Sequence, residues 1–262
     1  MTADIPAIPF DVRLMNGTAA TLFVLFTLMA IAALAAWAAN HGLFAISAVT
    51  VSGDITHNNA VTLRANVVPR MAGSFLTIDL ARTRTAFESV PWVRRAIVRR
   101  EFPNRLKVVL QEHRAVAYWG PEGDSRLLNS YGEVFEANAG EVEHEALPRL
   151  SGPAGQEPQV LNLYQLLAPQ FEALDLSLEQ LELSGRGSWI AHLDTGAVIE
   201  LGRGTDTELQ ARTARFLKTL TQVTSRYQRR PDAVETADLR HAGGYALRLR
   251  GVSTGGTDTK KK

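Results

Sequence analysis

The longest apolar run in the chain lies near its N-terminus. No Asp, Glu, Lys or Arg occurs between Arg13 and Asp54, and within that gap Ala19–Ala39 is almost wholly apolar. A helix needs about 20 such residues to cross a hydrocarbon core of roughly 30 Å. The pattern therefore predicts a transmembrane helix over 17–40, preceded by a short tail over 1–16. The residues assigned to the membrane anchor are Ala19, Leu25 and Trp37.

A cleaved secretory signal is the alternative for this segment, because Ala36-Trp37-Ala38 resembles a small-x-small cleavage site. Signal cores are typically about 7–15 residues long and follow a clearly basic region. Here the run is longer and only Arg13 is basic before it, so an uncleaved anchor is favoured. Because the twenty residues after Ala39 contain no Lys or Arg, the positive-inside rule places the N-terminus in the cytoplasm.

The segment that follows predicts a small unit, 44–115, in the order β-α-α-β-β. Its first strand is β-branched and closes at a Gly-Asp turn. Two short helices come next, the first capped by Asn58 or Asn59 and the second preceded by Asp79. The last strand alternates apolar and polar residues, which is typical of a sheet with one buried face. The predicted strands are Phe44–Ser52, Val93–Arg100 and Leu106–Leu110.

The remaining part, 117–250, shows short alternating runs separated by turn residues, which indicates a β domain built of hairpins. Helices are predicted over Val160–Leu174 and after the capping box Thr205–Glu208. Pro148–Pro158 is interpreted as a Gly/Pro-rich loop, and the polar tail 251–262 is expected to be disordered. The fold class is α+β, with one N-terminal helix, a β-α-α-β-β unit and a mixed antiparallel β domain with flanking helices.

Composition excludes several functions. Lys and Arg number 28 against 27 Asp and Glu, and a balanced charge argues against nucleic acid as a partner. Cysteine is absent, which excludes disulfides, zinc thiolates and cysteine nucleophiles. A local cluster of arginines is interpreted first as a solvated strand face and second as a partner-binding patch. Its members are Arg94, Arg95, Arg99 and Arg100.

No catalytic motif of a common hydrolase, nucleotide-binding or metal-binding class occurs in the sequence. Gly202-Arg203-Gly204 lies between a predicted strand and helix, where an anion can dock on helix amides, but a structural turn is favoured. His144 lies among Glu141, Glu143 and Glu145, a pattern more typical of a solvated loop than of a metal site. We therefore expect no catalytic residue, no metal, no cofactor and no small-molecule substrate.

The order of these elements, together with particular residues, resembles the FtsQ/DivIB family of bacterial cell-division proteins, in its proteobacterial FtsQ form. The motifs that carry the resemblance follow one another over about residues 14–250. They are Val49–Gly53, Pro91-Trp92-Val93, Val98–Arg100, Phe102-Pro103-Asn104, Leu106, Leu110, Glu112 through Ala117-Tyr118-Trp119, Ser188-Trp189 through Leu201–Gly204, and Asp238-Leu239-Arg240.

This resemblance implies a POTRA domain over 44–115 and a β domain over 117–250, both periplasmic. It implies a non-enzymatic scaffold of the inner membrane that recruits the FtsB–FtsL pair at the division septum. Two alternatives are kept: a POTRA-type periplasmic chaperone of outer-membrane assembly, and a membrane-anchored hydrolase. A chaperone of that kind usually carries tandem POTRA repeats or a barrel, whereas this sequence predicts a single POTRA unit, which disfavours the chaperone.

The partner-binding site is expected at the end of the β domain. The last predicted strand, Tyr245–Arg250, is followed by no further strand, so its outer edge is free to accept a partner strand unless an earlier strand covers it. Tyr245, Leu247 and Leu249 share one face, and the alternative is that they only complete the core. Resemblance adds Arg240 and His241, with Arg186 as a weaker member. The full candidate set is Arg186, Arg240, His241, Gly243, Gly244, Tyr245, Leu247 and Leu249.

Overall fold

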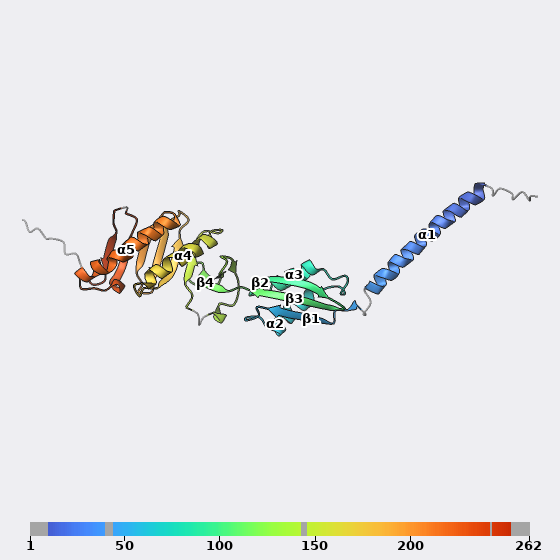
Figure 1. The fold of residues 1–262 in the computed structure, drawn as a ribbon, viewed down its shortest axis with the longest axis horizontal. Helices are drawn as coiled ribbons and strands as arrows, with labels where there is room; N and C mark the ends of the chain where they lie inside the picture. The colour runs from blue at the N-terminus through green and yellow to red at the C-terminus, as the bar shows by residue number, and fades with distance from the viewer. Residues whose placement is uncertain (1–9, 40–43, 143–145, 242, 253–262) are drawn as a thin grey trace, which may run out of the picture. The chain divides into compact units, whose positions relative to one another are not determined.

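The chain divides into two compact units in the computed structural model, one over Met1–Glu112 and one over His113–Lys262 (Figure 1). The residues that the structure describes are 10–39, 44–142, 146–241 and 243–252. His144, its neighbours Glu143 and Glu145, and the predicted tail from 253 onward lie outside them.

Helix α1, Phe10–Ala39, begins earlier than the predicted start at residue 17. Asp11 lies in its first turn, where a carboxylate interacts favourably with the positive end of the helix dipole. Three threonine hydroxyls inside the apolar stretch donate to backbone carbonyls three or four residues earlier, so they do not interrupt it. They are Thr18, Thr21 and Thr27. Within the described ranges, α1 alone is long and apolar enough to cross a membrane.

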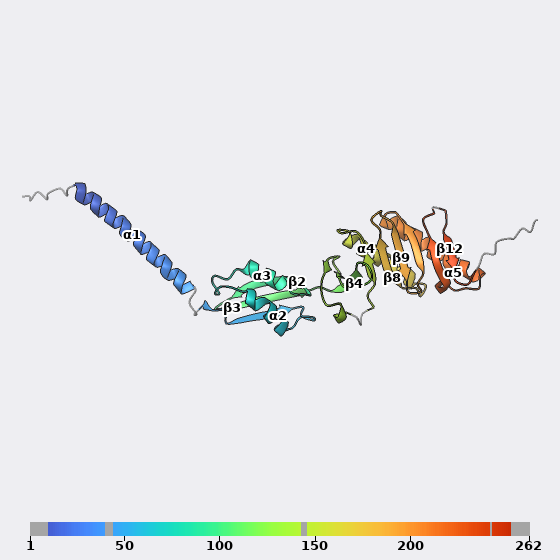
Figure 2. The ribbon, with the colours of Figure 1, turned by 180° about the vertical axis from the view of Figure 1, so that it is seen from behind.

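The rest of the first unit has the predicted order β-α-α-β-β, which is confirmed (Figure 2). Its sheet has the order β1-β3-β2, with β1 parallel and β2 antiparallel to the central β3. Asn59, not Asn58, caps the first helix by accepting from the amides of Val61 and Thr62. The elements are β1 Ala48–Gly53, α2 Ala60–Val67, the 3-10 turn η2 Val68–Arg70, α3 Leu80–Glu88, β2 Val93–Glu101 and β3 Arg105–Glu112.

One face of this sheet is covered and the other is open. Helices α2 and α3 place Leu63 and Phe87 in the same apolar cluster as Val108 of β3. On the opposite face, Ile97 of β2 and Val109 of β3 are paired in register and remain 44% and 36% exposed. The arginine cluster divides accordingly: Arg99 is exposed on the open face, whereas Arg100 donates to three carbonyls of the 75–78 segment.

Glu112, at the end of β3, is a buried carboxylate held by many donors. Its oxygens accept from the backbone amides of Thr56, His57 and Asn58 at 2.9–3.0 Å and from the Asn58 side chain at 2.8 Å. Burial alone would raise the pKa of Glu112, but these hydrogen bonds together lower it below its usual value. The His57 ring stacks on the buried Trp92 at 3.8 Å, so the whole loop is fixed against β3 and the start of β2.

The second unit is built on one nine-stranded sheet, with strand order β12-β11-β10-β9-β8-β7-β4-β5-β6. The strands are β4 Ala115–Trp119, β5 Leu127–Asn129, β6 Val134–Phe135, β7 Arg149–Ser151, β8 Leu178–Leu183, β9 Trp189–Leu193, β10 Val198–Gly202, β11 Val234–Asp238 and β12 Ala246–Leu249. The helices are α4 Glu157–Glu172 and α5 Asp206–Arg226, with 3-10 turns η3 Ala139–Glu141 and η4 Pro231–Ala233.

Three of the pairings in this sheet are parallel, and one of them corrects the sequence analysis. The parallel pairs are β4 with β7, β7 with β8 and β10 with β11. The interpretation of Pro148–Pro158 as a loop was wrong at both ends, because Arg149–Ser151 is the strand β7 within the sheet and helix α4 already begins at Glu157. A strand of three residues between Pro148 and Gly152 is too short to show a periodic pattern.

Helices α4 and α5 cover one face of the sheet, in front of the strands in Figure 1 and behind β8, β9 and β12 in Figure 2. Their apolar sides share a core with the strands, in which Phe171, Trp189 and Phe216 are fully buried. The predicted capping box of α5 is confirmed, since Thr205 and Glu208 bond reciprocally. These helices also make the crossovers of two of the three parallel pairs, because α4 connects β7 to β8 and α5 connects β10 to β11.

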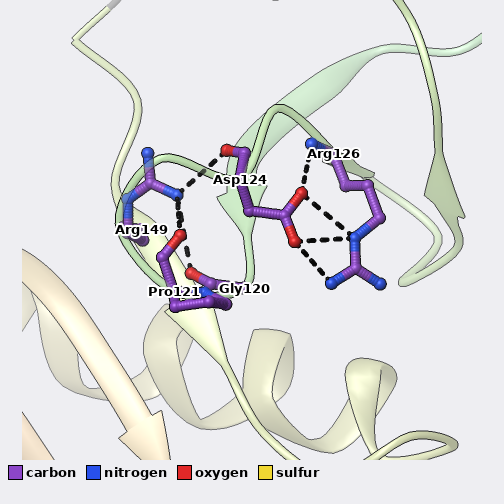
Figure 3. Close-up of polar contacts among 5 residues, drawn as sticks. All are labelled: Gly120, Pro121, Asp124, Arg126 and Arg149. Carbon is purple, nitrogen blue, oxygen red and sulfur yellow. Dashed lines mark hydrogen bonds and ion pairs between the residues drawn. The ribbon is translucent and has the colours of Figure 1, made fainter.

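The loop between β4 and β5 is held by two arginines around Asp124 (Figure 3). The Arg126 guanidinium binds both carboxylate oxygens of Asp124, with a shortest distance of 2.6 Å, and lowers the pKa of that carboxyl to about 2. Arg149 of β7 donates to the carbonyls of Pro121 at 3.0 Å and of Asp124 at 3.3 Å. The loop is therefore tied to a strand that sequence analysis did not predict.

Candidate functional site: the edge strand and the arginine pocket

Strand β12 is the terminal strand of the sheet. It pairs on one side with β11, where Asp238 faces Ala246 and Thr236 faces Arg248. On its other side, no strand within the described part of the chain pairs with it. An edge strand of this kind presents unpaired backbone donors and acceptors to solvent, to which a strand from another chain can add.

The face of β12 that carries the predicted apolar residues is turned toward the core. Leu249 is buried, and Tyr245 and Leu247 are partly buried against the core cluster. The Tyr245 ring makes an edge contact with Phe216 at 5.0 Å, with the ring planes at 90°. These three side chains therefore anchor the strand to the core, and its outer edge is left without a paired strand among the described residues.

The other face of β12 is polar and solvated. Ala246 and Arg248 are exposed, and Arg248 forms an ion pair with Glu235 of β11 at 3.0 Å. Gly243 and Gly244, which precede the strand, are exposed, and a Cβ at either position would meet open space. They leave the approach to the edge unobstructed. His241 is exposed on the same connection.

A pocket of about 490 Å³ lies where three connections of the sheet come together. They are the β8–β9 turn, the connection from β10 to α5 and the end of β11. Arg186 and Arg240, which the sequence analysis proposed from distant segments, both line it. Arg203 and Arg212 also line it: Arg203 lies in the Gly-Arg-Gly run that was interpreted as a structural turn, and Arg212 was not predicted as a site residue. The lining residues are Ser184, Arg186, Ser188, Gly202, Arg203, Arg212 and Arg240.

Two of these four arginines are fixed by bonds within the unit. Arg240 bonds Asp238 through two nitrogens at 2.6 and 2.9 Å and Glu200 at 2.9 Å. This contact is the main reason that the pKa of Asp238 falls to about 2. Arg212 donates to the backbone carbonyls of Leu201 and Arg203.

The other two arginines carry charge that the unit does not neutralise. Arg186 and Arg203 are exposed, and among the described residues neither forms an ion pair. Guanidinium groups bind carboxylates in a forked geometry, so this pocket suits an acidic side chain. The described residues contain no group of three or more His, Cys, Asp or Glu able to hold a metal. The second unit therefore carries both an open strand edge and a basic pocket.

A single apolar N-terminal helix, a β-α-α-β-β unit and a sheet with an open edge define the class: a POTRA-domain protein with a candidate membrane anchor. Comparison with family models agrees. Residues 44–113 match the FtsQ-type POTRA domain, and residues 117–240 match the C-terminal domain of cell division protein FtsQ/DivIB. Strand β12 lies beyond the second matched range.

Relatives cover nearly the whole chain. The chain is 39% identical to the cell division protein FtsQ of Thiomonas arsenitoxydans, over 95% of this chain and 91% of the relative. It is 38% identical to that of Burkholderia pseudomallei, over 92% and 94%. The FtsQ of Bordetella pertussis is 36% identical, over 91% and 92%. The chain belongs to the FtsQ family of cell division proteins.

Proposed function

We propose that this protein is a non-enzymatic scaffold of the divisome that captures the FtsB–FtsL pair at the septum. The observation that carries the proposal is the open edge of β12 in the same unit as the arginine pocket. A partner strand adds to β12 through backbone hydrogen bonds, and an acidic side chain of that partner binds Arg186 and Arg203. Membership of a cell-division family supports a divisome role.

The proposed placement is a type II protein of the inner membrane. In this placement helix α1 is the anchor, and the charge pattern around it supports an N-terminus in the cytoplasm and both globular units in the periplasm. In this placement the β12 edge faces periplasmic segments of other division proteins. Depletion of the protein should then give filamentous cells, whereas loss of outer-membrane proteins would favour an assembly chaperone.

The edge is tested by truncation after Ala242, which removes β12 and leaves the other strands of the sheet. Capture of the FtsB–FtsL pair by the purified chain should be lost, because the β12 edge is gone and β11, which becomes the terminal strand, presents a different edge. Full binding by the truncated chain would contradict the proposal. Trp189, fully buried in the core of this unit, reports by its fluorescence whether the remaining sheet is folded.

The pocket is tested by Arg186→Glu together with Arg203→Glu. Charge reversal should weaken capture at least tenfold and reduce its salt dependence, because two exposed cations that face the partner become repulsive. The matched control is Arg226→Glu with Arg230→Glu, which changes the net charge equally at exposed positions outside the pocket. An equal loss in both variants would show a general charge effect and exclude the pocket.

A further inference from the structure

The turn between β2 and β3 carries the most exposed apolar side chain of the first globular unit. Phe102 is 88% exposed, and Leu76 on a neighbouring loop is 49% exposed. Single exposed hydrophobic residues are ordinary on a protein surface and need no explanation. Phe102 differs from a scattered surface residue because its turn lies beside the segment through which the chain enters this unit from α1.

The β2–β3 turn is bonded to the segment through which the chain enters the unit. Ser47, just before β1, donates through its amide and hydroxyl to Asn104, at 2.9 and 2.8 Å. The carbonyl of Phe44 accepts from the Phe75 amide at 2.7 Å, next to Leu76. The entering chain, the turn and the 75–76 loop thus share one end of the sheet, as can be followed at the start of β1 in Figure 1.

The membrane-spanning candidate ends close to this point in sequence. Its last residue, Trp37, is seven residues from Phe44. An extended chain covers at most about 3.6 Å per residue, so the two are separated by no more than about 25 Å. The β2–β3 turn therefore stays within reach of the bilayer that holds α1. Because the two are tethered, the effective concentration of the bilayer surface at the turn is high.

Two cations lie opposite each other on the open face of this sheet. Arg99 of β2 is paired in register with Lys107 of β3, and both are exposed. Like charges directly opposite on two strands destabilise a sheet. No ion pair to either residue occurs within the described part of the chain. The repulsion between Arg99 and Lys107 thus destabilises the isolated unit, and binding of an external anion between them would relieve it.

We propose that this end of the first unit docks on the bilayer that carries α1. Phe102 enters the interfacial layer, where aromatic rings are favoured, and Arg99 and Lys107 bind anionic phospholipid headgroups. The occupant is a bilayer surface because an apolar tip and adjacent cations match an interface with an apolar interior and anionic phosphates. The inference rests on α1 being the membrane anchor, as proposed above.

The test uses the full chain in lipid nanodiscs. The chain has no cysteine, so Ala48→Cys places one fluorescent label on an exposed residue paired with Arg105, beside the turn. Quenching by a headgroup-nitroxide lipid is compared in phosphatidylcholine with and without phosphatidylglycerol. Quenching should rise with phosphatidylglycerol and fall with added salt, since screening acts beyond about 8 Å at physiological ionic strength.

Two variants separate the apolar and charged contributions. Phe102→Ser should lower the docked population about tenfold in both lipids. Arg99→Gln with Lys107→Gln should remove the increase in docking that phosphatidylglycerol causes, to which each cation contributes about fivefold. The double substitution should not destabilise the unit, because it relieves the repulsion between the two cations. The controls are Tyr227→Ser, another exposed aromatic, and Lys218→Gln with Arg226→Gln, both in the second unit.

Two results would overturn the inference. One is quenching that is equal in the two lipids and unchanged by Phe102→Ser. The other is an equal loss caused by the control variants. A chain that fails to incorporate into nanodiscs would instead refute the anchor itself, so the two failures are distinguishable.

Discussion

The phenol oxygen of Tyr245 lies 2.8 Å from the hydroxyl oxygen of Thr219, and this bond joins the start of the edge strand to helix α5. Together with the edge contact between Tyr245 and Phe216, it fixes β12 from the covered face of the sheet. The outer edge therefore does not have to be ordered by the partner. An edge held in place before binding reduces the entropic cost of adding a strand.

Tyr245→Phe removes this hydroxyl and keeps the ring contact with Phe216. We expect a loss of about 1 kcal/mol in the free energy of unfolding, because one hydrogen bond is lost and Thr219 keeps its bonds to backbone carbonyls. Urea denaturation followed by Trp189 fluorescence measures it, and Tyr227→Phe at an exposed site is the control. A larger loss of stability in Tyr227→Phe than in Tyr245→Phe would contradict a stabilising hydrogen bond between Tyr245 and Thr219.

Glu112→Gln removes the charge that holds the loop 56–58 to β3. The free energy of unfolding of the first unit should fall by about 2–3 kcal/mol, since hydrogen bonds to a charged group are strong and the amide cannot accept all of them. Denaturation followed through the buried Trp92 reports it. Glu101→Gln is the control, because that residue is exposed and its substitution should stay within about 0.5 kcal/mol.

Asp124→Asn tests the loop of Figure 3 through its pH dependence. The pKa of Asp124 falls from 3.8 to about 2 in the folded protein. Its contribution to stability is thus complete above the unfolded pKa and is lost as the pH falls through the folded value. The stability difference between the native protein and Asp124→Asn should narrow between about pH 4 and pH 2. In an Arg126→Gln background this narrowing should shrink, and an unchanged profile would exclude the ion pair as its cause.

The sequence predicts local structure well where one signal is strong. The capping box at Thr205 and the alternation of β3 are confirmed because each depends on neighbours within a few residues. β7 was missed because its position is set by pairing with β4 and β8, which no local pattern reveals. For the same reason, the pocket that joins Arg186 to Arg240 becomes visible only when the sheet is formed.

Gly202→Ala tests the geometry of the pocket. Gly202 has a φ of +79°, and a Cβ there would lie 2.7 Å from the Arg240 Cγ. Alanine should cost about 1–2 kcal/mol for the left-handed backbone and displace Arg240 from its carboxylate partners. Capture of the FtsB–FtsL pair should weaken in a binding assay. Gly155→Ala is the matched control, because its φ of +86° imposes a similar backbone cost and its Cβ would meet open space outside the pocket, and an equal effect of both would argue against the pocket.

Leu25→Arg tests the anchor. A charge at the centre of a spanning helix costs about 2.5–3.5 kcal/mol of insertion free energy, so membrane association after a high-salt wash should decrease. Thr27→Ser is the control, because it keeps a hydroxyl in the same helix and should leave membrane association unchanged. A chain that is cleaved before Ala39 in its mature form would contradict a retained anchor.

In the proposed complex, the pairing of β12 with β11 would also determine the response to mechanical load. A strand added at the outer edge runs along β12, and β12 itself is paired along its length with β11. Tension applied along such a strand loads its backbone hydrogen bonds together in shear, whereas tension across the sheet breaks them one after another. A protein tethered at one end by α1 and at the other by a partner strand would therefore hold best when the pull follows the strand axis.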